Sequence, residues 1–473
     1  MIRPRALLAT AVTMFAAGFA ALAVLQHRAF STGRFDLGNL TQAVWSTAEG
    51  NVLEITDLSG RQISRLGAHF DPLVAAFAPL WWLWPDPSLL LVAQAGAVAL
   101  GALPVHWLAR KHLDSERAAL GFALVYLLYP ATQWLVLDDF HPLALATPLL
   151  LFAFWFLDEE LLAPFALCAG LACLTKEHIG FTVAALGVWY ALTHHRPREG
   201  LLIAAGGALV AIVAVGWLVP HFAPGGGSPF AGRYEAVGGS PGGIVTTAIT
   251  DPLQVAGEAT QVRDLAYLRD LLAPLAGLPL LAPLVASTTV PELAANLLSS
   301  TRTQTSIHFH YTAGAIPGLI VATIFGAARL RSWIGLGTHS AARVAVAVAL
   351  LAGIVYGPIP LWRHVPFGET LAARDHLVTE HARVAERALA GIPADAAVSA
   401  TNTLGAHLSE RRRVFSFPVL REATWVAIDT TRLSYRDDAV ARERGAAALR
   451  RLRADPEWKV VFDDDGVLVL RRG

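Results

Sequence analysis

The stretch RFDLGNLTQAVWSTAEGN, residues 34–51, follows an apolar N-terminal run, MIRPRALLATAVTMFAAGFAALAVLQ. The apolar part of this run is too long for a signal peptide, and no small-residue cleavage site follows it. It therefore predicts an uncleaved membrane helix over roughly residues 6–27. By the positive-inside rule, Arg3 and Arg5 place the N-terminus in the cytoplasm, so the helix delivers Asp36 to the outer side. We expect an amphipathic segment with a carboxylate at its head on that surface.

The composition of the whole chain predicts a polytopic α-helical membrane protein. Of its 473 residues, 54% are hydrophobic and 16% charged, and the mean hydropathy is +0.48. A soluble domain carries about 25% charged residues. Apolar runs long enough to cross a bilayer recur along most of the chain. The net charge is zero, so no basic field indicates a nucleic-acid partner.

The distribution of charge divides the chain into two domains. Residues 363–473 hold 18 Lys/Arg and 16 Asp/Glu, whereas residues 1–362 hold the other 40 of the 74 charged residues. This shift predicts a transmembrane domain over 1–362 and a soluble domain over 363–473. In the second domain, DAAVSAT and TWVAID are typical of strands, LGAHLSERR and DAVARERGAAALRRLR of helices, and WKVVFDDDGVLVLRR of a hairpin turning at Asp465-Gly466. We expect a small α/β domain.

The loops between apolar runs alternate in character and predict about eleven membrane crossings. Loops 138–142, 175–180 and 221–262 fall outside, and loops 157–160, 194–198 and 327–333 inside. A helical hairpin over about 265–298 returns the chain to the outside, and the run 341–361 exports the C-terminal domain. The first outer loop, 28–87, includes a run with two prolines and three tryptophans over 70–85, which is typical of a juxtamembrane helix. The protein is thus expected to be a multi-pass plasma-membrane protein with an extracytoplasmic C-terminal domain. Cys168 and Cys173 share one apolar run without metal spacing and are interpreted as core residues.

Polar residues gather on the outer side, in or beside apolar segments. They are Asp36, Asn39, Gln42, His69, Asp71, Asp138, Asp139, His141, Lys176, Glu177, His178, His308 and His310. Ionisable groups at membrane depth are costly and usually face a polar cavity, so each is a functional candidate. Their convergence from five separate loops favours a functional site.

Each of these residues also has a structural interpretation. Asp36 could be the N-cap of a helix starting at Leu37. Asp138-Asp139 could be a solvated loop pair, and Lys176-Glu177 an exposed salt bridge worth about 0–1 kcal/mol. The histidines could bond to helix ends.

Several motifs resemble a known family. They are FDLGNLTQAVW with EGN, GAHFDPLVAAFAPLWWLWPDP, DDFHP, TKEHIGF, and PELAANLLSS with HFHYTAGAIP. Together they resemble a large family of predicted prokaryotic membrane proteins catalogued as a domain of unknown function. The resemblance covers about residues 1–330 and, more loosely, 392–413.

That family in turn is similar in architecture to the membrane-embedded glycosyltransferases of the GT-C type. In those enzymes an acidic residue follows the first helix and juxtamembrane helices lie behind it. Their donor is usually a sugar on a polyprenyl phosphate, and a soluble domain often follows.

The resemblance implies roles for the outer residues. Asp36 would be the general base that takes the proton of the acceptor hydroxyl, and Asp139 or Glu177 a second acid that orients the acceptor or binds a metal. Positive groups would hold the departing lipid phosphate; the candidates are Lys176, Arg302, His308 and His310. His69 and His141 would contact sugar or metal, and Asn39, Gln42 and Tyr311 complete the candidate substrate contacts. A divalent cation could bind through Asp36, Asp139, His141 and Glu177, but no ligand spacing decides it.

The implied reaction transfers a sugar from a polyprenyl-phosphate donor to a cell-envelope glycan, lipid or protein. A transporter or channel is the competing interpretation, but its site usually lies at the midplane between repeats. Here the polar groups crowd one face and no repeat is visible, which favours an enzyme. A lipid-phosphate hydrolase would use the same site with water as acceptor. A non-catalytic polysaccharide-binding or assembly protein is a further alternative.

Overall fold

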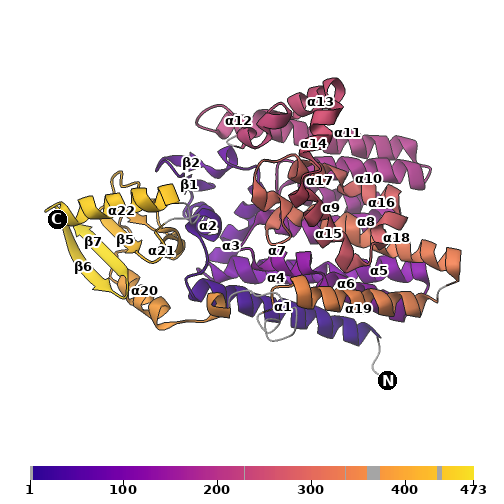
Figure 1. Ribbon diagram of the computed structural model, residues 1–473, viewed down its shortest axis with the longest axis horizontal. Helices are drawn as coiled ribbons and strands as arrows, with labels where there is room; N and C mark the ends of the chain where they lie inside the picture. Colours follow the sequence, from indigo (N-terminus) through magenta and orange to yellow (C-terminus); the bar gives the residue numbers. More distant parts are fainter. Residues whose placement is uncertain (1–3, 228–229, 336, 360–372, 434–438) are drawn as a thin grey trace.

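A computed structural model describes residues 4–227, 230–335, 337–359, 373–433 and 439–473. Helices fill most of the molecule, and a sheet with its own helices stands at one end (Figure 1). Helix α1, Pro4–Arg28, runs along one edge of the helical part toward the sheet. The expected boundary between residues 362 and 363 lies outside the described residues.

The helical part consists of many segments of unequal length. After α1 come the turn η1 (Arg34–Gly38), α2 (Asn39–Ala48), η2 (Arg65–Gly67), η3 (Pro72–Phe77), α3 (Ala78–Trp81), α4 (Ser88–Leu100), α5 (Ala102–Leu113), α6 (Glu116–Leu128), α7 (Pro130–Leu137), η4 (Pro142–Leu145), α8 (Ala146–Asp158) and α9 (Leu162–Cys173). Then follow α10 (Ile179–Thr193), α11 (Pro197–Val213), η5 (Ala214–Leu218), α12 (Val219–Phe222), η6 (Ala231–Val237), α13 (Pro241–Thr250), α14 (Pro252–Glu258), α15 (Val262–Leu272), α16 (Pro283–Ala286), α17 (Val290–Leu297), η10 (Arg302–Thr305), η11 (His310–Thr312), α18 (Ile316–Ile334) and α19 (Thr338–Tyr356).

Within the described residues, four helices are long and apolar enough to cross a membrane. They are Pro4–Arg28, Ser88–Leu113, Pro197–Phe222 and Thr338–Tyr356. The pair α6 and α7, bent by 46° where Pro130 follows the extended Tyr129, makes up to five. The expected count of eleven is not confirmed. Several apolar runs form helices of only 10–17 residues, and the region expected as a hairpin, 265–298, is broken by short 3₁₀ turns at its prolines.

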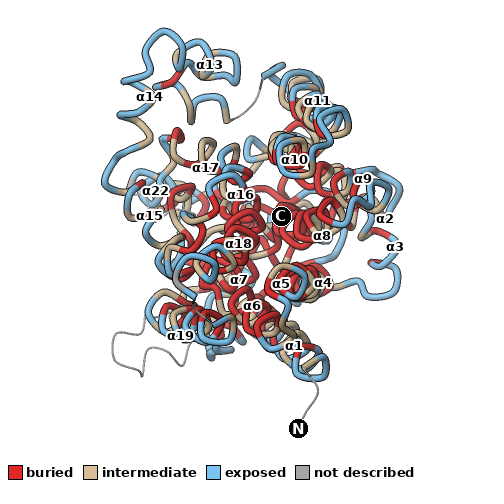
Figure 2. The backbone as a smooth tube through the Cα atoms, turned by 90° about the vertical axis from the view of Figure 1, so that its right-hand side faces the viewer, coloured by how far each residue is buried: buried red, intermediate tan, exposed pale blue. Residues whose placement is uncertain are grey.

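Burial is concentrated in the centre of the helical part. Figure 2 shows buried backbone around α5, α6, α7, α8 and α18, and an exposed outer side on α11. The exposed side chains of α11 include Leu202 and Leu209, which suits a helix in contact with lipid. Trp81 is buried, whereas Trp82 and Leu83 are exposed by 70% and 83%. This short helical run therefore presents apolar side chains outward, as expected of a juxtamembrane segment.

The C-terminal domain contains a five-stranded mixed sheet in the order β4-β3-β5-β7-β6. Strands β3 (Val398–Ala400), β4 (Val414–Ser416) and β5 (Trp425–Asp429) are parallel, and β6 (Trp458–Asp464) and β7 (Val467–Arg472) form the predicted hairpin at Asp465-Gly466. The helices are α20 (Glu380–Ala390), α21 (Asn402–Ala406) and α22 (Ala439–Ala454). The prediction of a small domain containing a sheet is confirmed.

The helix predicted over LGAHLSERR is wrong beyond its first residues, because α21 ends at Ala406. The chain then turns back toward the sheet, where the Arg411 guanidinium donates to the carbonyl oxygens of Leu408, Pro393 and Ala396. The Arg411 side chain thus joins Leu408 to the segment 393–396 and stabilises a turn where a helix was predicted.

The first outer loop and the C-terminal domain contact each other directly. A small antiparallel pair, β1 (Glu54–Thr56) and β2 (Gln62–Ser64), lies at this junction beside α2 (Figure 1). The Gln42 amide donates to the carbonyl oxygens of Arg411 (3.0 Å) and Arg412 (3.1 Å). Residues of the loop and the domain therefore lie at the same end of the helical part.

Candidate functional site

The turn that carries Asp36 is one turn of π-helix, Arg34–Gly38, closed by a hydrogen bond from Gly38 N–H to the Gly33 carbonyl. The helix therefore begins before Asp36, and its N-cap position is Gly33. The caps of η1 and α2 are both glycines without side-chain cap bonds. The interpretation of Asp36 as an N-cap is therefore wrong.

The ring of His141 lies close to this carboxylate. Its Nε2 lies 3.4 Å from Asp36 Oδ1, and its Nδ1 lies 2.6 Å from the Asp138 carbonyl oxygen. The fully buried Gln94 of α4 holds this loop: its Oε1 accepts from His141 N–H at 2.9 Å and its amide donates to the Asp139 carbonyl at 2.6 Å. A Gln inside an apolar helix thus aims the DDFHP motif at the first outer loop.

Asp138 and Asp139 each accept a backbone N–H from a distant segment. Gly33 N–H donates to Asp139 Oδ2 (2.9 Å), and His310 N–H donates to Asp138 Oδ2 (2.7 Å). Burial and the neighbouring charge of Asp36 raise the pKa of Asp139 to about 8. The interpretation as a solvated loop pair is therefore wrong: these carboxylates tie three loops together.

His310 stacks on His141, with ring centroids 3.6 Å apart and an interplanar angle of 16°. Its Nδ1 lies 2.8 Å from Asp138 Oδ2. Burial alone would lower the pKa of His141, but the carboxylates of Asp36 and Asp138 outweigh it and raise that pKa. Burial and the neighbouring His141 hold the pKa of His310 well below its usual value. The two stacked rings are therefore shifted in opposite directions, His141 toward its charged form and His310 toward its neutral form.

Asp138, His141 and His310 could also hold a metal ion. One ligand atom from each lies within 4.8 Å of the others. A carboxylate with two imidazoles suits Zn²⁺ or a similar divalent cation. Of the four ligands considered from sequence, only His141 belongs to this group. Glu177 bonds instead to the His69 ring and the Phe70 N–H.

Glu177 and Lys176 lie between α9 and α10, and both are largely buried. Glu177 accepts from Phe70 N–H (3.1 Å), and its Oε1 lies 3.0 Å from His69 Nδ1. Burial lowers the pKa of Lys176, and the charges of Glu177 and Asp71 oppose that shift. The interpretation as an exposed Lys-Glu salt bridge is wrong. The charges of both Asp36 and Lys176 act on the His310 ring, so the two groups of residues share one site.

Two further contacts frame this site. Arg65 pairs with the buried Asp71 (2.6 Å) and donates to Asn39 Oδ1 (2.5 Å). His178 Nε2 lies 2.9 Å from Glu292 Oε2, and Glu292 is 1% exposed. Arg65 and Glu292 were not predicted. An acid inside the apolar run of α17 was the available signal for Glu292, whereas nothing local distinguishes Arg65 from an ordinary loop arginine.

Arg233 is the other residue that the sequence did not indicate. It lies in η6, with its guanidinium 4.3 Å from the centroid of the Phe230 ring, which stacks on His69 at 4.4 Å. Burial raises the pKa of Tyr311, and the Arg233 charge beside it opposes the shift. Arg233 therefore adds a second cation to the side of the site that holds Lys176 and Tyr311.

Two predicted residues lie apart from this group, whereas His308 lies beside it, where its charge opposes the rise in the pKa of Asp138 that burial causes. The Gln42 amide is buried and fully used at the junction with the C-terminal domain, bonding Thr56 and the two arginine carbonyls. Arg302 is exposed in η10. The His308 ring lies against Trp134, with centroids 4.5 Å apart.

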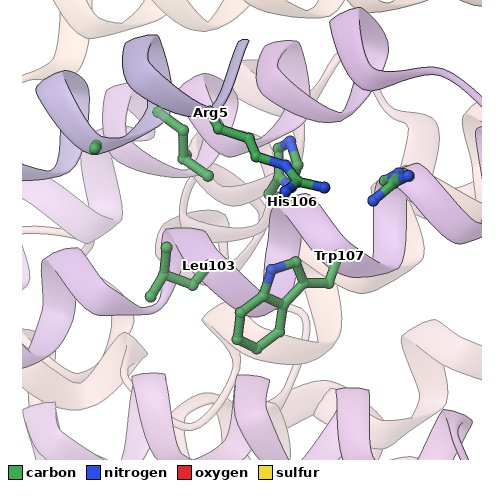
Figure 3. Close-up of a pocket in the computed structure, with 7 residues that line it drawn as sticks. Arg5, Leu103, His106 and Trp107 are labelled. Atoms are coloured by element: carbon green, nitrogen blue, oxygen red, sulfur yellow. The ribbon is translucent and has the colours of Figure 1, made fainter. Parts of the chain in front are cut away.

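An apolar cavity of about 260 Å³ lies beside the site. It is lined by Leu73, Ala97, Leu100, Leu145, Pro148, Leu149, Phe152 and Leu171. Leu73 follows Asp71 closely and its N–H donates to the Leu174 carbonyl, so the cavity borders the segments that carry Asp71, His141 and Lys176. A second cavity, of about 290 Å³, is lined by Arg5, His106 and Trp107 (Figure 3). It lies at the start of α1, whose 25 residues span about 37 Å, and so at the end of that helix away from Asp36.

Comparisons with known proteins bear on the family and the fold. A family model described as "Predicted membrane protein (DUF2079)" matches residues 26–469. No curated protein matches the sequence. Among solved structures, the apo-state crystal structure of ArnT from Cupriavidus metallidurans aligns with a TM-score of 0.51 at 15% identity, covering 97% of this chain and 98% of that chain. At this identity the similarity shows a shared fold.

Proposed function

The chain belongs to the DUF2079 family of predicted membrane proteins and resembles in fold ArnT, a GT-C type glycosyltransferase, and we propose that it is a membrane-embedded glycosyltransferase. In this proposal it moves a sugar from a polyprenyl-phosphate donor to an extracytoplasmic acceptor. One observation supports it most: the carboxylate of Asp36 contacts His141 in a site that also contains the cations Lys176 and Arg233.

In the proposed reaction, the carboxylate that takes the proton and the cations that hold the leaving phosphate lie at opposite ends of the site. The oxygen of the acceptor hydroxyl attacks the anomeric carbon while the bond from that carbon to the phosphate oxygen breaks. The hydroxyl proton passes to the Asp36 carboxylate, and the phosphate leaves with the electron pair. Lys176 and Arg233 would hold this anion. His141 orients Asp36, and Asp139 and Glu177 would orient the acceptor and the sugar.

The donor class is supported by the apolar cavity. A lipid-linked substrate needs a polar site with an apolar surface beside it, and the cavity lined by Leu73, Leu145 and Leu171 would supply one. Trp82 and Leu83 are further exposed apolar side chains that a lipid could contact. His69, His310 and Tyr311 line the polar side and are proposed sugar or phosphate contacts, as is Asn39 through its bond to Arg65.

The test measures release of polyprenyl phosphate, because this product is common to every sugar. Purified protein in lipid nanodiscs is incubated with synthetic farnesyl-phosphate hexoses and pentoses, with and without a cell-envelope extract as acceptor. We expect acceptor-dependent release. The Asp36→Asn variant keeps the shape of the side chain but loses its basicity, so the rate should fall by about 10²–10⁴-fold with an unchanged thermal midpoint.

The matched control is Glu49→Gln, an exposed acid at the end of α2, which should retain the full rate. Release that is equally fast without acceptor would identify a lipid-phosphate hydrolase. Full activity in Asp36→Asn would exclude Asp36 as the base.

A further inference from the structure

The residues just before Asp36 are held by three separate anchors. Gly33 N–H donates to Asp139 Oδ2 within the helical part. Phe35 N–H donates to Asn402 Oδ1 at 3.1 Å. The Arg34 side chain, 2% exposed, reaches into the C-terminal domain. Two of the three anchors thus come from a domain whose sheet lies at the end of the molecule (Figure 1).

Arg34 is bound entirely by neutral groups. Its Nη1 donates to Ser416 Oγ (2.7 Å), and its Nη2 donates to the carbonyl oxygens of Thr56 (2.8 Å) and Val414. Among the described residues, no carboxylate lies within ion-pair distance of it. Burial lowers its pKa to about 10. A buried charge is costly unless its donors are satisfied. Both η nitrogens of Arg34 are bonded, and its Nε has no partner among the described residues, so the η bonds tie the Asp36 turn to strands β1 and β4.

Three glycines at this contact lie too close to neighbouring atoms to carry a side chain. A Cβ on Gly33 would lie 2.7 Å from Asn402 Nδ2, and a Cβ on Gly38 would lie 3.1 Å from the Cα of Ala406. A Cβ on Gly405 would lie 3.0 Å from the Arg34 side chain. The Asp36 turn therefore packs directly against α21, and three glycines allow this close contact.

The position of α21, directly after a parallel strand of the sheet, explains why it can bind the Asp36 turn. Asn402 begins the helix that directly follows the parallel strand β3. The carboxyl ends of parallel strands are where sheets of this kind usually bind ligands. Here the backbone N–H of Phe35, the residue directly before Asp36, takes that place.

We propose that the C-terminal domain is a positioning element for Asp36, with Asn402 and the Arg34 cradle as the residues that set the carboxylate against His141. This rests on the proposed function, in which Asp36 is the base. Donor binding depends on Lys176 and Arg233, which belong to the helical part. Loss of the Asn402 anchor should therefore slow transfer without weakening donor binding.

The first measurement tests the anchor and needs no substrate. Full-length protein carrying Asn402→Leu, which removes the acceptor at similar size, is compared with wild type by hydrogen exchange of the peptide spanning 31–38. We expect exchange at Phe35 to rise at least about tenfold while peptides of α1 are unchanged. Asn402→Asp retains an acceptor oxygen and should restore protection. Thr403→Ala is the matched control, because its hydroxyl lies on the same helix and has no hydrogen-bond partner among the described residues.

The second measurement separates positioning from binding. With the farnesyl-phosphate sugars above, kcat of Asn402→Leu should fall by about 10- to 100-fold, the range expected of a base displaced by about 1 Å. Its affinity for farnesyl phosphate should stay within twofold of wild type. Ser416→Ala, which removes one Arg34 acceptor, should show the same pattern to a smaller degree. This second variant still tests the positioning role if Asn402→Leu misfolds.

The outcomes are distinct. Unchanged exchange at Phe35 overturns the anchor, and faster exchange with unchanged kcat shows a purely structural contact and overturns the positioning role. Absence of transfer by wild type overturns the proposed function, and the exchange measurement still decides whether Asn402 holds the turn.

Discussion

His141 contacts groups that belong to different loops through each of its ring nitrogens. Nδ1 lies against the Asp138 carbonyl, which leaves Nε2 toward Asp36. This geometry orients the ring before any substrate arrives, and the stacked His310 limits its rotation. At the residue scale, the site is therefore organised by backbone carbonyls and N–H groups as much as by charged pairs.

Lys176 should govern the affinity for the donor phosphate. Hydrogen bonds to charged groups contribute about 1.5–3 kcal/mol, so Lys176→Ala should weaken binding of farnesyl phosphate by roughly 10- to 100-fold. Lys176→Arg should preserve part of the affinity. Titration of the protein in nanodiscs measures both. Arg302→Ala, at an exposed position, should have a smaller effect. Unchanged affinity in both Lys176→Ala and Arg233→Ala would argue against a phosphate-linked donor.

His381 gives the C-terminal domain a dependence on pH. It lies on α20, with Nδ1 3.0 Å from Asp465 Oδ2 and Nε2 3.2 Å from Asp429 Oδ2. Burial alone would lower the pKa of His381, but the two carboxylates outweigh it and raise that pKa above 6.5. The folded state thus holds the proton more tightly than the unfolded state. The resulting stabilisation is complete below pH 6.5 and is lost as the pH rises through the folded pKa.

The measurement is hydrogen exchange of the β6–β7 peptides in denaturant, at several pH values from 6 upward. Wild type should lose protection as the pH rises, and His381→Gln should show a smaller loss. The control is His195→Asn at an exposed loop position. Equal pH dependence in wild type and His381→Gln would contradict the prediction.

At the scale of elements, α10 and α11 pack through glycines. A Cβ on Gly207 would lie 2.6 Å from the Gly180 carbonyl oxygen and 2.7 Å from Ala184 N. A Cβ on Gly187 would meet the Gly200 carbonyl at 2.6 Å. Small residues allow such close backbone approach between membrane helices. Since Glu177 and His178 directly precede α10, this contact also holds part of the site.

The Gly207→Ala substitution should force the two helices apart and destabilise the protein by about 1–3 kcal/mol. The thermal midpoint of the purified protein measures this loss. Gly206→Ala is the matched control on the same helix, because its Cβ would meet nothing within 4 Å. That control should be neutral or slightly stabilising, since alanine favours a helix over glycine by up to about 1 kcal/mol. Equal midpoints for the two variants would contradict close packing here.

At the scale of the whole molecule, the first outer loop and the C-terminal domain must share one side of the membrane. Their contacts through Arg34 and Gln42 require it. We predict that this side is extracytoplasmic. In a background without Cys168 and Cys173, cysteines at the exposed positions Ser59 and Lys459 should react with an impermeant maleimide on intact cells, whereas one at Arg117 should not. Labelling of Arg117→Cys alone would reverse the orientation, and labelling of only one of the other two would contradict the domain contact.

Local patterns of the sequence determined the membrane character and the terminal hairpin at Asp465-Gly466, and they predicted the juxtamembrane run and the site residues Asp36, Asp139, His141, Lys176 and Glu177. Apolar runs, turn residues and costly polar residues in apolar surroundings are signals that each segment carries by itself. Only the tertiary structure showed that several of the expected spans contain helices of 10–17 residues, because proline breaks and chain folding act between segments. It also decided that Arg233 and Glu292 join the site, that Gln42 serves the domain junction, and that Asn402 holds Phe35. These contacts join residues far apart in the chain, and their geometry depends on how whole elements pack.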